Sequence, residues 1–165
     1  MEDLTLFLVS AVWLAGYVVG LGAVTVIDLH GFLGRTSPYW TEATVRTHKV
    51  TKPLIWLGLI LAGAGSLWYF SQTGFTELSY IYLAILAVLL INGSFLSFYV
   101  SPYLLRQERA GRAQELLPFS LQVKITISFL LSFTGWWGSF LLTLYLLGLA
   151  GGLQIADLLG FFGAS

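Results

Sequence analysis

The stretch LTLFLVSAVWLAGYVVGLGAVTVI, residues 4–27, contains no charged side chain. The hydrocarbon core of a bilayer is about 30 Å thick, so a helix of about 20 apolar residues crosses it. We therefore expect this stretch to span a membrane. It is preceded only by Met1, Glu2 and Asp3. A secretory signal would begin with basic residues and have a shorter apolar run, so the span is expected to be retained.

Three further segments have the same character, at about 53–70, 80–100 and 121–149. Hydrophobic residues make up 57% of the 165-residue chain and charged residues only 10%, whereas soluble domains carry about 25% charged residues. Six tryptophans suit a protein that needs anchors at the membrane interface. The sequence thus predicts one all-α transmembrane domain over residues 1–165, a four-helix bundle with the lipid bilayer as its solvent.

The basic residues indicate the orientation of the predicted bundle. All eight fall between the first and second spans or from the end of the third span into the fourth: Arg35, Arg46, Lys49, Lys52, Arg106, Arg109, Arg112 and Lys124. The termini and the connection between the second and third spans have no basic residue and contain four of the eight acidic ones: Glu2, Asp3, Glu77 and Asp157. By the positive-inside rule, both basic connections lie in the cytoplasm and both termini lie outside. We expect a multi-pass protein of the bacterial inner membrane.

The first connection has signals of its own. Ser37 followed by Pro38 is typical of a helix N-cap and first helical position, which predicts a short interfacial helix over about residues 38–51. Pro53 then breaks or kinks the chain. The second span starts afresh at Pro53 or continues from the loop helix with a kink, and the sequence leaves both readings open. A second interfacial helix is predicted over about residues 153–162.

Small residues recur at helical spacing within the spans, including the pairs Gly16 and Gly20 in the first and Gly135 and Gly138 in the fourth. In lipid, small residues let helix backbones approach closely, and polar side chains bond across helices. The pattern fits packing within one bundle. The alternative is that one such face forms a homo-oligomer or docks on another membrane subunit.

Three polar side chains of the spans are candidate site residues: Asp28, Asn92 and Lys124. Ionisable groups in a membrane are costly and are usually paired or functional. A structural Asp28–Lys124 pair is one expectation, and a role in moving protons or ions is another. The two histidines, His30 and His48, are candidate ligands of haem b or a metal ion. His30 is expected in the loop beside Gly31, and two histidines fall short of a closed tetrahedral site.

Motifs of soluble enzymes and nucleic-acid binders are absent from the sequence. There is no Walker A loop, no G-x-S-x-G and no H-E-x-x-H. The absence of cysteine excludes disulfides and thiolate sites. Zero formal net charge and the lack of any recognition motif predict no nucleic-acid partner.

Three segments carry a family resemblance: VWLAGYVVGLG in the first span, LAGAGSLWYF in the second and QVKITISFLLSF in the fourth. The chain resembles small bacterial four-helix membrane proteins, the broad group of CopD-type copper-resistance proteins and HemJ-type protoporphyrinogen oxidases. In the haem-linked members a histidine in the first span and a lysine in a later span are used. Lys124 matches the lysine, and residues 4–27 lack the histidine.

Three functions therefore remain open. The leading hypothesis is a non-enzymatic membrane subunit or oligomeric scaffold. The second is a redox protein that binds haem or a metal through His30 and His48. The third is a small transporter with a polar path at Asp28, Asn92 and Lys124.

Overall fold

A computed structural model describes residues 2–34, 40–113, 115 and 117–150. These residues are helical apart from short connections, and they contain no strand. The elements are α1 (Glu2–Gly34), α2 (Trp40–Thr73), α3 (Glu77–Phe95), the π-helical turn η1 (Leu96–Val100), α4 (Ser101–Arg109) and α5 (Phe119–Ala150).

Four helical segments are long and apolar enough to cross a membrane: Leu4–His30, Thr44–Thr73, Glu77–Arg109 and Phe119–Gly148. Each contains most of a predicted span, so the prediction of four long apolar helices is confirmed, and each segment also reaches beyond its predicted span at one end or both. Most side chains in these segments face outward, and Val18 is 78% exposed. Apolar side chains that point away from the core are what lipid-facing helices require.

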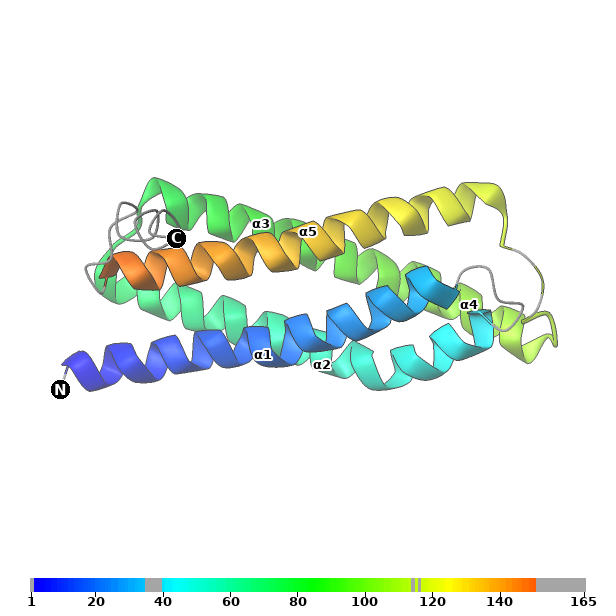
Figure 1. Ribbon diagram of the computed structural model, residues 1–165, viewed down its shortest axis with the longest axis horizontal. Helices are drawn as coiled ribbons and strands as arrows, with labels where there is room; N and C mark the ends of the chain where they lie inside the picture. The colour runs from blue at the N-terminus through cyan, green and yellow to red at the C-terminus, as the bar shows by residue number, and fades with distance from the viewer. Residues whose placement is uncertain (1, 35–39, 114, 116, 151–165) are drawn as a thin grey trace, which may run out of the picture.

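The four rods run nearly alongside one another, with α1 and α2 forming one closely packed antiparallel pair and α3 and α5 the other (Figure 1). Glycine makes the α1–α2 contact close. A Cβ added at Gly58 would meet the backbone of Gly20 and lie 2.7 Å from the carbonyl oxygen of Gly16. A Cβ at Gly65 would lie 2.7 Å from the Cα of Trp13. The small-residue spacing in the sequence therefore serves contacts within the chain at these positions.

The sequence left open whether the helix predicted over residues 38–51 ends before Pro53 or continues into the second span. The chain is helical from Trp40 onward, and this helix continues through Pro53 as part of α2, which is the second of the two readings. Ser37 and Pro38 lie outside the described residues. The N-terminal part of α2 runs at an angle to the rest (Figure 1), as expected where proline removes one backbone donor. Both parts are held by packing, because Val45 and Ala62 are each buried. The predicted helix over 153–162 also lies outside the described residues.

Short connections close the bundle. After α2, Gly74 adopts a positive φ of 91° and its N–H donates to the Phe70 carbonyl oxygen at 2.8 Å, which terminates the helix. Thr76 then caps α3, because its side chain accepts from the Ser79 N–H while the Ser79 hydroxyl oxygen accepts from the Thr76 N–H.

The bundle has two cores, one toward each end. The larger core lies toward the end with the start of α1 and the end of α5. Six of its twelve buried side chains are aromatic, and we call this part the aromatic half: Trp13, Tyr17, Tyr69, Phe70, Tyr82 and Trp136. The smaller core joins α2, η1, α4 and the start of α5, and we call this part the basic half because the described lysines and arginines lie there: Val45, Val100, Leu104, Leu117 and Leu121.

Candidate functional site

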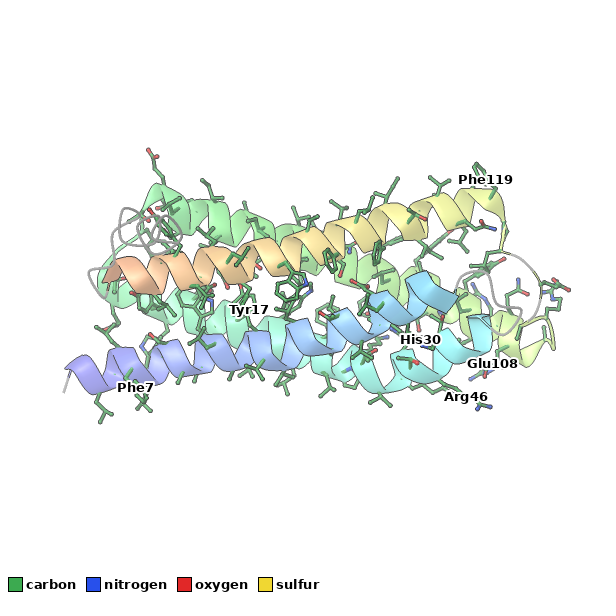
Figure 2. The ribbon with its side chains drawn as sticks, viewed as in Figure 1. Phe7, Tyr17, His30, Arg46, Glu108 and Phe119 are labelled. Carbon is green, nitrogen blue, oxygen red and sulfur yellow. The ribbon has the colours of Figure 1, made fainter. Side chains whose placement is uncertain are left out.

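At the centre of the aromatic half, buried polar side chains are paired with one another. The Tyr82 hydroxyl oxygen accepts from the Trp13 indole N–H at 2.7 Å and from the Tyr17 hydroxyl at 2.9 Å. All three side chains are at most 1% exposed, and Tyr17 points from α1 into the bundle (Figure 2). The rings of Trp13 and Tyr82 meet edge to face at 5.1 Å between centroids. This network joins α1 to α3 and presents no group to a ligand.

A shallow hollow of about 320 Å³ opens at the α2–α3 turn in this half. Its lining includes Tyr69, Phe70, Glu77 and Leu146. None of the residues predicted from the sequence as site residues lines it.

Asn92, predicted as a polar residue of the third span, is bonded across to α5. Its amide nitrogen donates to the Ser128 carbonyl oxygen at 3.0 Å, and the Ser128 hydroxyl donates to the Asn92 side-chain oxygen at 2.6 Å. Both residues are buried. This pair holds α3 against α5.

A second set of polar contacts joins α2 to the π-helical turn η1. The Ser101 N–H donates to the carbonyl oxygen of Leu96 rather than that of Ser97, and Pro102 has no N–H to offer. The Ser97 carbonyl oxygen is therefore left without a backbone donor. The Lys52 ammonium from α2 donates to it at 3.2 Å, and the Trp56 indole N–H donates to the Ser97 hydroxyl oxygen at 3.0 Å. Lys52 thus compensates for the local change in the helix.

Sequence reasoning did not find this arrangement. It assigned Lys52 to orientation alone and did not consider Pro102. A proline inside an otherwise helical apolar run was the available signal, because proline removes an N–H and crowds the preceding turn.

The basic half also contains buried polar atoms without a partner. Among the described residues, four buried side-chain atoms lack a hydrogen-bond partner, and we call their residues the unpartnered residues: Asp28 (Oδ2), Thr44 (Oγ1), His48 (Nε2) and Gln107 (Oε1). Native interiors satisfy nearly all buried polar atoms, and these four exceptions come from α1, α2 and α4.

Helix register places Asp28 and His48 at similar depth. Gly20 packs on Gly58, and each step forward along α1 matches a step back along the antiparallel α2. Asp28 therefore lies within about one turn of the level of His48. Asp28 also follows Tyr17, Leu21 and Val24 around α1, which are all buried, so it is on the side of the helix that faces the bundle interior.

The other predicted site residues lie elsewhere. His30 belongs to α1 and to its apolar segment, so its expected place in a loop was wrong. The helix continues past it to Gly34. Lys124 is exposed, and its ammonium lies 5.9 Å from the centroid of the Tyr99 ring. In the described part of the chain no ion pair joins Lys124 to Asp28, and Asp28 Oδ2 has no partner.

The positions of these side chains are relevant to the metal site and the polar path that the sequence predicted. Within the described residues, no three His, Cys, Asp or Glu side chains gather to hold a metal ion. Asn92 is occupied by Ser128, and Lys124 is on the outside, so the structure does not bring Asp28, Asn92 and Lys124 together as one path. It brings Asp28 close in depth to His48 instead.

No protein-family model matches the chain, and no curated protein or solved structure shows significant similarity to it. The resemblance to CopD-type and HemJ-type proteins therefore stays a prediction.

Proposed function

We propose that this chain is a multi-pass membrane protein that acts as a non-enzymatic subunit, with its basic half at the cytoplasmic side of a bacterial inner membrane. One observation carries the proposal. Four long helices turn apolar side chains outward along their length, while the described basic residues lie together at one end. Lipid is the solvent that such a surface suits, and the positive-inside rule favours this orientation.

The closed interior supports a structural role. In the aromatic half the Tyr82 and Tyr17 hydroxyls and the Trp13 indole are bonded to one another, and glycines bring α1 and α2 into contact. A rigid bundle of this kind is suited to packing against other membrane helices, either those of a second copy or those of another subunit.

Topology can be tested by single-cysteine labelling because the chain contains no cysteine. Gln72→Cys lies at the exposed α2–α3 turn, and Ala110→Cys lies at the exposed end of α4. In intact cells with the outer membrane permeabilised, we expect an impermeant maleimide to label the Gln72→Cys variant and to spare the Ala110→Cys variant. Labelling of both variants from one side, or recovery of the chain in the soluble fraction, would overturn the proposal.

A second candidate role is the binding and movement of protons or small cations in the basic half. The unpartnered residues favour it, because Asp28, Thr44, His48 and Gln107 each have a buried atom without a partner. Ionisable side chains within membrane spans commonly mark ion or proton paths, and Asp28 and His48 are two such side chains.

This second role is tested in vesicles that enclose a pH-sensitive dye. A proton leak through the wild-type chain is expected to fall to the level of protein-free vesicles with Asp28→Asn. The matched control is Glu115→Gln, which neutralises an exposed carboxylate of the basic half and is expected to change nothing. Equal leaks in the wild-type and Asp28→Asn proteins would contradict a transport role for Asp28.

A further inference from the structure

Two lysines flank the outward face of the π-helical turn. Lys52 comes from α2, and its ammonium lies 5.6 Å from the centroid of the Phe98 ring. Lys124 comes from α5 and lies 5.9 Å from the centroid of the adjacent Tyr99 ring. Phe98 is 73% exposed and Tyr99 55% exposed. The surface therefore has an ammonium at each border and two aromatic rings between them.

Among the described residues no ion pair is formed by Lys52 or Lys124, and the Lys52 ammonium donates to the Ser97 carbonyl oxygen. An ammonium has three donors, so Lys52 keeps two of them for another acceptor. The face carries two positive charges and has unused hydrogen-bond donors.

The face around Phe98 and Tyr99 lies at a depth that corresponds to the edge of the hydrocarbon core of a bilayer. The apolar segment begins at Glu77, and about 20 residues cross the hydrocarbon core, which places Phe98 and Tyr99 near its far edge. Arg106 lies about 10 Å further along the helix from Tyr99. In the opposite direction, toward the start of α3, the outward surface of the helix is apolar: Ile91 is 71%, Ile81 52% and Val88 45% exposed.

We propose that Lys52, Phe98, Tyr99 and Lys124 form a binding site for the headgroup of an anionic phospholipid. The ammonium at each border of the face attracts the negatively charged headgroup, the aromatic rings lie at the level of the glycerol backbone, and the acyl chains lie along α3. Charge complementarity selects an anionic lipid over a zwitterionic one, because no carboxylate of the described residues balances the two lysines. The proposal depends on the proposed function insofar as the chain must lie in a membrane.

The test measures lipid retained by purified protein. Wild-type and variant chains are reconstituted in vesicles of equal parts phosphatidylglycerol and phosphatidylcholine and extracted in mild detergent, and retained lipids are counted by native mass spectrometry. We expect Lys124→Gln to lower the relative affinity for phosphatidylglycerol about fivefold and Lys52→Gln with Lys124→Gln roughly 25-fold.

Two variants serve as controls. Lys49→Gln removes an exposed lysine one turn from Lys52 and is expected to retain phosphatidylglycerol as the wild type does. Lys52→Arg keeps both the charge and a donor for Ser97, and we expect it to retain the lipid. Lys124 is exposed, so Lys124→Gln tests the site even if the Lys52→Gln chain fails to fold.

Several outcomes would overturn the lipid site. The first is that the folded double variant retains as much phosphatidylglycerol as the wild type, or that Lys49→Gln loses as much as Lys124→Gln. The second is that the wild type retains phosphatidylcholine as well as phosphatidylglycerol. The third is that inorganic phosphate stabilises the wild-type protein against unfolding as strongly as phosphatidylglycerol does. Failure of the proposed function is seen separately, because a chain that is not a membrane protein would appear in the soluble fraction before any lipid is measured.

Discussion

The aromatic half and the basic half are built from the same four long helices, but they differ in whether their buried polar groups have hydrogen-bond partners. In the aromatic half, Trp13, Tyr17 and Tyr82 satisfy one another's polar groups and are almost fully buried. In the basic half, Asp28 and His48 each have a buried side-chain atom that no described residue satisfies. The first half is arranged for stability. The second keeps polar atoms in a place where they cost free energy, as functional regions commonly do.

The two halves also differ in the regularity of their helices. The described π-helical turn and the proline within α2 both lie in the basic half. There, Lys52 replaces a missing backbone donor at Ser97. Regular helices packed through glycine make up the aromatic half, and irregular helices held by side chains make up the basic half.

The largest expected effect comes from filling the close contact in the aromatic half. Gly65→Ala would place a Cβ 2.7 Å from the Cα of Trp13, so the helices must separate. We expect a loss of about 3 kcal/mol in the free energy of unfolding, measured by titration with a denaturing detergent. The control is Gly63→Ala on the same helix, where a Cβ meets nothing within 4 Å, and it is expected to stabilise by about 0.5 kcal/mol. Equal results for the two variants would show that the contact is not close.

The second-largest effect is expected from removing the Tyr82 hydroxyl oxygen, which accepts from both Trp13 and Tyr17. Tyr82→Phe leaves the Trp13 indole N–H and the Tyr17 hydroxyl without the oxygen to which they donate. We expect a loss of about 2 kcal/mol in the same titration, since an unsatisfied buried donor costs about 1–3 kcal/mol. Tyr80→Phe, at a position 62% exposed, is expected to stay near the wild type. A stable Tyr82→Phe protein would mean that the aromatic half tolerates unsatisfied groups as the basic half does.

A double-mutant cycle tests the compensation in the basic half. Pro102→Ala restores a backbone N–H near Ser97, so the Lys52 ammonium is no longer the sole donor for that carbonyl oxygen. We expect Lys52→Gln to cost less stability in the Pro102→Ala background than in the wild type, by about 1 kcal/mol. Additive effects of the two changes would show that Lys52 does not compensate for the proline.

The smallest expected change is at Asp28, one of the unpartnered residues. Asp28→Asn replaces a carboxylate whose Oδ2 has no partner with a neutral side chain of the same shape. We expect the free energy of unfolding to stay within about 0.5 kcal/mol of the wild type or to rise, because no bond recorded for Oδ2 is lost. A loss comparable to that of Tyr82→Phe would show that Asp28 is paired, and the contrast between the halves would disappear.

Much of the fold could be predicted from the sequence, and less of the site. The apolar runs near residues 4–27 and 121–149 are local signals, and the helices that contain them are present. At Pro53 the sequence left both a break and a kinked continuation open, and packing of Val45 on one side and Ala62 on the other keeps α2 continuous. Asn92 was predicted as a polar residue of the third span, but its partner Ser128 was not predicted, because that partner lies on another helix.

The number of long apolar helices and the position of the basic residues at one end follow from local sequence, because hydrophobic length and charge are properties of single segments. The contacts between helices do not follow from local sequence: Tyr82 accepts from Trp13 and Tyr17, Lys52 reaches Ser97, and Asp28 and His48 are left with unpartnered atoms. These outcomes depend on how helices distant in sequence are rotated and aligned. A register change of one residue turns each side chain by about 100° and alters every such contact.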